Sequence, residues 1–266
     1  MSAIASRVLS AGVLLVWAAV LLYFELSGRV ANYLHPAFHF WTFSSAVVLA
    51  AMAAALLLTR PSDSDAPPIR WPARLFGTGV LVIPLLLATW ISPSQFGATA
   101  VWNRGFVQDV GDLAAYQPPM DPPLPREDGS IGEGEPMNPS LYLPRNEKGQ
   151  LQAEAIDLLY AAKEPTLRPD FENKEVEIIG QFLPARTGNA DGDRFNLVRM
   201  FVLCCAADAR PLAVTVKAAP GTSFPEMEWI KVTGRATFPV ESGRHTPLVI
   251  ADHIEPTEPP PETFLY

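Results

Sequence analysis

The chain has 266 residues and a net charge of −8, from 28 acidic and 20 basic side chains. The charge is uneven, because the first 104 residues hold six arginines against three acidic residues, and the rest holds 14 basic against 25 acidic ones. Because residues 105–266 are this acidic, they lack the basic surface that neutralises nucleic-acid phosphates. We therefore expect no nucleic-acid partner. The sequence has no Gly-x-Ser-x-Gly elbow, phosphate-binding glycine loop or His-Glu-x-x-His motif, so we expect no enzymatic activity.

Three long apolar segments lie in residues 1–104, which we predict to form a transmembrane domain. They cover about 8–24, 38–58 and 73–91, and Arg74 is the only charged residue within them. Each is long enough to cross a hydrocarbon core of about 30 Å as a helix, and a backbone in lipid must satisfy its own hydrogen bonds. The first segment lacks a small-x-small cleavage site, so we expect a retained helix rather than a signal peptide. We therefore predict three helices in a lipid bilayer.

The arginines near these segments predict an orientation. Arg60 and Arg70 lie between the second and third segments, and Arg7 precedes the first. Cytoplasmic loops carry an excess of arginine and lysine, so we expect a cytoplasmic N-terminus. Three crossings then leave the C-terminal domain on the extracytoplasmic side.

Residues 105–168 are predicted to be an acidic tether rich in proline and glycine. Eight prolines and three glycines lie between positions 118 and 144, which excludes a continuous helix or a central strand. A short amphipathic helix is expected at about 151–163, because Leu151, Ala155 and Leu158 recur at helical spacing. Pro165 ends it.

Residues 169–266 are predicted to form an all-β domain. Turn-forming residues separate five β-rich runs, and Gly180 and Gly234 lie where bulges would let a small barrel turn a corner. Five short strands fit an OB-like small barrel, with a small sandwich as the alternative. The runs are Glu175–Ile178, Phe195–Cys205, Leu212–Lys217, Trp229–Thr237 and Leu248–Ile254.

Cys204 and Cys205 are the only cysteines, and they are adjacent. Three hypotheses stay open for them. One cysteine fills the barrel core as a small hydrophobe, since neighbouring strand residues point to opposite faces. Both thiols bind a soft or zinc-like cation together with Asp208 and with His253 or His245. The pair forms a strained vicinal disulfide that acts as a redox switch.

A second candidate site lies where the first loop meets the second apolar segment. His35 and His39 are four residues apart and would share a face of a helix that began early, as two metal ligands can. Pro36 favours a helix that starts after His35, which separates the two rings. Histidines beside aromatic residues also fit an ordinary interfacial belt, so this site is the weaker prediction.

Several stretches resemble one uncharacterised bacterial family. They are Asn173–Gly180, Phe195–Pro211, Trp229–Gly234, the loop Gly28–Pro36 and the segment Ser92–Gly105. The most specific motif is a Cys-Cys-Ala-Ala-Asp signature, which an Arg-Phe-Val run precedes in the family; here Met200 separates Arg199 from Phe201. Members of this family are described as subunits of two-component membrane permease complexes.

The resemblance implies a multi-pass permease partner in the bacterial inner membrane. Many members carry a His-rich stretch between the second and third helices, which suggests zinc, but this chain has Pro61–Pro68 there. We predict a non-enzymatic accessory subunit whose helices dock the partner and whose outer β-domain binds or gates substrate. The alternative is a metal- or thiol-dependent binding protein of the cell envelope, with a divalent metal such as zinc as its cofactor.

Overall fold

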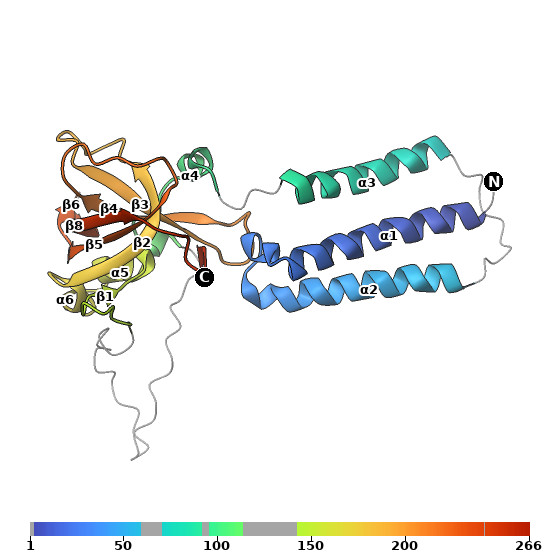
Figure 1. Cartoon of the computed structure of the whole chain (residues 1–266), viewed down its shortest axis with the longest axis horizontal. Coiled ribbons are helices and arrows are strands. Elements are labelled where there is room, and N and C mark those ends of the chain that lie inside the picture. Colours follow the sequence, from blue (N-terminus) through green and yellow to red (C-terminus); the bar gives the residue numbers. More distant parts are fainter. Residues whose placement is uncertain (1–2, 60–70, 92–95, 114–142, 242) are drawn as a thin grey trace, which may run out of the picture. The chain divides into compact units, whose positions relative to one another are not determined.

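The computed structural model describes residues 3–59, 71–91, 96–113, 143–241 and 243–266, and Figure 1 shows the chain. The chain forms two compact units. The first comprises Met1–Gln95 together with Cys204–Ala207, and the second comprises Phe96–Leu203 together with Asp208–Tyr266. The tether's proline-rich part, residues 114–142, lies outside the described residues.

The first unit contains the three predicted helices. They are α1 (Ala3–Leu26), α2 (His39–Leu58) and α3 (Trp71–Ile91), with 3₁₀ turns η1 (Arg29–Asn32) and η2 (Pro36–Phe38) before α2. All three helices are long and apolar enough to cross a membrane. This confirms the predicted helices and indicates a membrane protein.

Helices α1 and α2 pack side by side along a seam of small residues (Figure 1). Four alanines at seven-residue spacing are at most 3% exposed: Ala11 and Ala18 on α1, and Ala46 and Ala53 on α2. Small side chains let two helices approach closely where no hydrophobic effect drives them together. Arg7 near the start of α1 donates from Nε to the carbonyl of Leu56 near the end of α2 (3.2 Å), so the two helices are antiparallel.

The strand pairings make the second unit a closed five-stranded β-barrel, whose strands are labelled in Figure 1. Its strands pair in the order β2-β5-β8-β4-β3, and β3 returns to β2. The β4–β8 pair is parallel and the other four pairs are antiparallel. This is the OB-like order, so the predicted OB-like barrel is confirmed. The strands are β2 (Glu175–Pro184), β3 (Arg194–Phe201), β4 (Arg210–Lys217), β5 (Trp229–Thr237) and β8 (Leu248–Pro256).

Short elements surround the barrel. They are α4 (Ala98–Arg104), η3 (Val110–Asp112), β1 (Leu151–Gln152), α5 (Ala155–Lys163), α6 (Arg168–Phe171), β6 (Val240–Glu241), β7 (Arg244–His245) and β9 (Phe264–Leu265). The short helix expected at about 151–163 begins only at Ala155. Leu151 and Gln152 instead extend the sheet by pairing with Val176 and Glu177. Within the predicted tether, Val107 donates its N–H to the carbonyl of Pro211 (2.8 Å) and is buried.

The core of the second unit follows the alternation of β3. Leu197 and Phe201 join the main cluster, which also contains Leu158 and Leu159 of α5. Val198 and Met200 point the other way and pack in a second cluster with Val101 of α4. Both faces of β3 are therefore buried, which fits the adjacent apolar pairs Leu197–Val198 and Met200–Phe201.

The two strand glycines differ in their roles. Gly234 follows a register shift in the β5–β8 pairing, which confirms the predicted bulge there, and a Cβ at this position would stand only 2.1 Å from the carbonyl oxygen of Ile250. Gly180 lies in a regular pairing of β2 with β5, so the predicted bulge is absent there, and a Cβ at this position would meet Leu197 Cγ at 2.7 Å. Close approach of a neighbouring strand therefore requires glycine at both positions.

Charged groups lie buried beside the barrel core. Arg199 on β3 is 3% exposed and donates from Nη2 to the carbonyl of Glu262 (2.8 Å). Burial lowers the pKa of this guanidinium, against the opposing effect of the Glu154 and Glu262 carboxylates. At the start of α5, Asp157 Oδ2 accepts the N–H of Glu154 (2.8 Å), and burial raises the pKa of Asp157 to about 6. Arg199 is thus a buried cation held by a backbone carbonyl and close to two carboxylates.

Replacing Asp157 with asparagine should change how stability depends on pH. The folded state raises the pKa of Asp157, so the carboxyl's contribution to stability is present below about pH 4 and lost as the pH rises through about 6. Two pKa units correspond to about 3 kcal/mol. Asp157→Asn keeps an acceptor for the Glu154 N–H and has no charge to bury.

The free energy of unfolding of the full chain in detergent, measured from pH 4 to pH 7.5, tests this. We expect Asp157→Asn to exceed the wild type by about 1–3 kcal/mol at pH 7 and to match it near pH 4. The exposed Asp191→Asn is the control, with no such difference. A difference independent of pH would show that Asp157 is not held in an unfavourable charged state.

Candidate functional site

The signature cysteines lie in the connection between β3 and β4. The alternation of β3 ends with the strand at Phe201, and neither cysteine enters the core, since Cys204 is exposed and Cys205 is half-buried. The hypothesis that one cysteine fills the barrel core is therefore wrong. Asp208 Oδ1 accepts the N–H of Leu203 (2.9 Å), which closes the turn around the two thiols.

Cys204, Cys205 and Asp208 are gathered tightly enough to hold a cation. Each offers one ligand atom, and these atoms lie within 4.8 Å of one another. Among the described residues, this is the only group in which three or more His, Cys, Asp or Glu side chains lie close enough together to hold a metal ion. The two Sγ atoms are 3.7 Å apart and are thiols rather than a disulfide. Two thiolates on one tetrahedral zinc, with Zn–S bonds of about 2.3 Å, stand about 3.8 Å apart. The sulfur spacing therefore suits a zinc-like ion, with a fourth position left for water or another ligand.

Backbone hydrogen bonds hold Cys204–Ala207 within the first unit. Leu34 and Cys205 form an antiparallel bridge. The N–H of His35 donates to the carbonyl of Cys204 (3.1 Å), and the N–H of Ala206 donates to the carbonyl of Tyr33 (2.7 Å). Main-chain atoms make all three of these contacts.

The first unit has an apolar hollow of about 450 Å³ beside the cysteines. Residues of α1, of the loop before α2 and of α2 line it together with both thiols. They are Leu21, Leu34, Phe38, Trp41, Thr42, Ser45, Cys204 and Cys205. Two thiols at an apolar wall favour a soft, weakly hydrated ligand over a hard cation that needs several oxygen ligands.

The two predicted histidines, His35 and His39, each have neighbours of their own. His35 precedes η2, and its Nδ1 accepts the N–H of Ala37 (3.1 Å). His39 is the first residue of α2, and its Nδ1 is 4.0 Å from Glu25 Oε1. His39 Nε2 and Glu25 Oε2 are both buried without a hydrogen-bond partner in the described residues. Glu25 was missed from the sequence, because it lies 14 positions before His39 and at the end of a different helix.

His253, the sixth predicted ligand, lies on β8 opposite Thr233. Its side chain is 64% exposed, and Nε2 is 3.5 Å from Glu255 Oε2. The three-residue cation group of the described structure includes none of His35, His39 and His253. The histidines therefore remain separate predictions.

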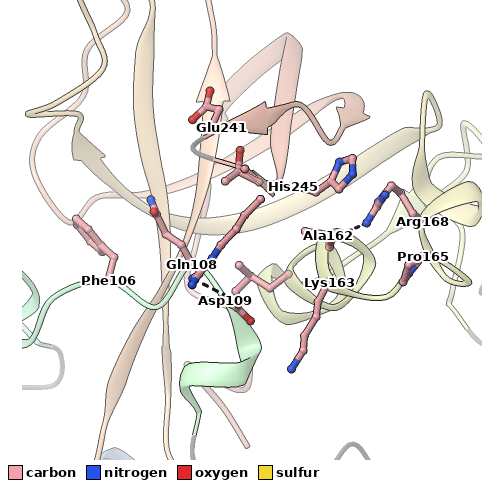
Figure 2. Close-up of a pocket in the computed structure, with 13 residues that line it drawn as sticks. Phe106, Gln108, Asp109, Ala162, Lys163, Pro165, Arg168, Glu241 and His245 are labelled. Carbon is pink, nitrogen blue, oxygen red and sulfur yellow. Dashed lines mark hydrogen bonds and ion pairs between the residues drawn. The ribbon is translucent and has the colours of Figure 1, made fainter.

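A larger cavity, of about 870 Å³, lies wholly within the second unit (Figure 2). Three stretches far apart in the sequence line it: the segment after α4, the end of α5 with the start of α6, and the β6–β7 hairpin. Sequence reasoning missed this cavity, since no local motif joins these stretches. Its lining residues are Phe106, Gln108, Asp109, Leu159, Ala162, Lys163, Pro165, Arg168, Glu241, Gly243, Arg244, His245 and Thr246.

Residues 155–266 match the family model described as the DUF1980 C-terminal domain. The match covers α5, α6, the five barrel strands and β9, including the cysteine loop, and somewhat less than half of the chain. The comparison with curated proteins found no match. This part of the chain is therefore similar to an uncharacterised family, whose description states no activity.

The geometry of the cysteine loop predicts how substitutions at Asp208 and at the two cysteines affect folding and zinc binding. Asp208→Asn retains an oxygen for the Leu203 N–H but removes the charge, so it should fold normally and bind zinc at least tenfold more weakly. Cys204→Ser with Cys205→Ser should abolish binding and change the unfolding free energy by no more than about 1 kcal/mol, because neither thiol is buried.

Zinc titration of the full chain in detergent, followed by calorimetry, measures both effects. His253→Gln is the matched control, since it removes a potential ligand outside the three-residue group. Unchanged zinc affinity in the double serine variant would remove the loop from consideration as a metal site.

Proposed function

We propose that this protein is a non-enzymatic accessory subunit of a membrane permease complex. Its helices dock a multi-pass partner, and its β-barrel unit, on the extracytoplasmic side, binds or gates the transported substrate. The arginine distribution and the family resemblance support the orientation and the class of partner. The observation that carries the proposal is that α3 buries no residue between Pro72 and Trp90.

Helix α3 lacks the packing that α1 and α2 share. Nothing between Pro72 and Trp90 is buried, and Phe76 and Trp90 are 75% and 86% exposed. By contrast, each of α1 and α2 buries two alanines almost completely. Lipid can cover apolar side chains, but it gives no reason for small residues on an unpacked helix.

Two such small residues lie on α3. A Cβ at Gly77 would meet nothing within 4 Å, and one at Gly79 would meet only Ile83 of the same helix, at 3.5 Å. Glycines in a membrane helix let the backbone of another helix approach closely, at the expense of side-chain contacts with lipid. Their surroundings in this chain therefore favour a partner helix that the chain itself does not supply.

A second function is favoured by the cysteine loop. The sulfur spacing, the nearby carboxylate of Asp208 and the apolar hollow fit a binding protein of the cell envelope that captures a zinc-like cation. The two functions are compatible, since a permease subunit can present a cation to its partner. They differ in whether the chain acts without a multi-pass protein.

Copurification from mild detergent distinguishes them. We expect the native protein to bring a multi-pass membrane protein with it, and Gly77→Val to lower the recovered partner at least fivefold, because a branched side chain keeps the helices apart. Leu87→Val on the same helix is the control, since it changes an exposed apolar side chain without adding bulk. Purification of the native chain alone, with zinc binding intact, would favour the second function.

A further inference from the structure

The cavity of the second unit concentrates positive charge in an acidic part of the chain. Four of its lining residues are basic or can become so: Lys163, Arg168, Arg244 and His245. Two are acidic, Asp109 and Glu241. Residues 105–266 as a whole carry 14 basic against 25 acidic side chains, so this local excess runs against the composition around it.

The acidic lining residues are engaged by other groups. Glu241 Oε1 is 3.1 Å from Nη1 of Arg194, which does not line the cavity. Asp109 Oδ1 accepts the N–H of Gly111 (2.7 Å), and its Oδ2 is 3.6 Å from Arg244 Nη1. Neither carboxylate forms an ion pair with Lys163 or Arg168 in the described structure.

Lys163 and Arg168 stand at the end of α5 and the start of α6 (Figure 2). Arg168 donates from Nη2 to the carbonyl of Ala162 (2.8 Å), which fixes the guanidinium at the cavity wall. Its Nε is buried and has no hydrogen-bond partner in the described structure, and neither cation has an ion pair there. A buried donor without a partner is costly, and an anionic ligand that draws the guanidinium into a new hydrogen bond would remove that cost.

His245 adds a directed polar group from the β6–β7 hairpin. Its Nδ1 is 2.7 Å from the carbonyl oxygen of Phe238. A carbonyl oxygen only accepts, so Nδ1 carries the proton and Nε2 is the nitrogen left for a ligand. Apolar side chains, those of Phe106, Leu159 and Pro165, form another part of the cavity wall.

We propose that this cavity binds a small organic anion through Lys163 and Arg168. Carboxylate or phosphate oxygens lie against the two cations, His245 Nε2 contacts a polar group of the ligand, and the apolar wall covers its carbon skeleton. A volume of about 870 Å³ falls in the range of small-molecule sites. The proposal is independent of the permease role and of the cysteine loop, whose residues do not line this cavity.

Isothermal titration of the full chain in detergent with citrate, and separately with inorganic phosphate, tests the proposal at constant ionic strength set with sodium chloride. We expect saturable citrate binding with a Kd below about 1 mM, and weaker binding of phosphate, which lacks a carbon skeleton for the apolar wall. Lys163→Gln should weaken citrate binding at least tenfold. Lys163 is exposed, so this change should leave the melting temperature within about two degrees of the wild type.

Lys174→Gln is the matched control, because it removes the same charge from an exposed lysine outside the cavity. Arg168→Gln provides a second variant at the cavity, and its fold is checked by the same melting measurement. Equal citrate affinity in Lys163→Gln and Lys174→Gln would overturn the proposal. So would the absence of saturable heat from both anions with the wild-type protein.

Discussion

The second unit depends on one strand that changes partner midway. β2 pairs with β5 from Glu175 to Gln181 and with β3 from Gln181 to Pro184, and this exchange closes the barrel. Closure leaves no open edge along the five main strands, which protects a small sheet from pairing with other chains. It also draws strands so close that Gly180 and Gly234 have no room for a Cβ without movement of a neighbour. The cavity wall of the second unit is built on this scaffold.

The second unit is acidic overall, yet it places positive charge at two positions inside it. The acidic unit buries Arg199 beside Glu154, near the start of α5, and lines its cavity with Lys163 and Arg168 at the end of that helix. A cation is attracted to nearby acidic groups. Two cations that line a cavity without forming an ion pair therefore need a structural or functional reason. For Arg199, the reason is its hydrogen bond to the Glu262 carbonyl and its attraction to the Glu154 and Glu262 carboxylates. For the cavity cations, we infer an anionic ligand.

The sequence predicted those features that depend on local periodicity. The apolar length of each N-terminal segment implied a membrane helix, and the strand runs with their glycines implied a small barrel. It could not predict features that depend on pairing between distant segments. Leu151 continues a helical pattern in the sequence yet pairs with Val176, because the sheet edge offers backbone hydrogen bonds that the helix start does not.

The candidate sites were predicted only where their residues are close together in the sequence. Cys204, Cys205 and Asp208 could be grouped because they lie within five positions. The core hypothesis for one cysteine failed because the strand alternation on which it relied stops at Phe201. The cavity brings Lys163 near His245, more than 80 positions later, and no spacing rule links such residues.

We infer that this membrane protein presents its cysteine loop outside the cytoplasm, on the side where we propose that a permease complex receives substrate. Cys204 and Cys205 are the chain's only cysteines, so the unaltered sequence allows a direct measurement. Intact cells of a bacterial host expressing the protein, treated with a zinc chelator, are exposed to a maleimide that crosses the outer envelope but not the inner membrane. We expect labelling in intact cells, equal to that after lysis, and protection when zinc is restored. Labelling that appears only after lysis would place the loop in the cytoplasm and contradict this inference.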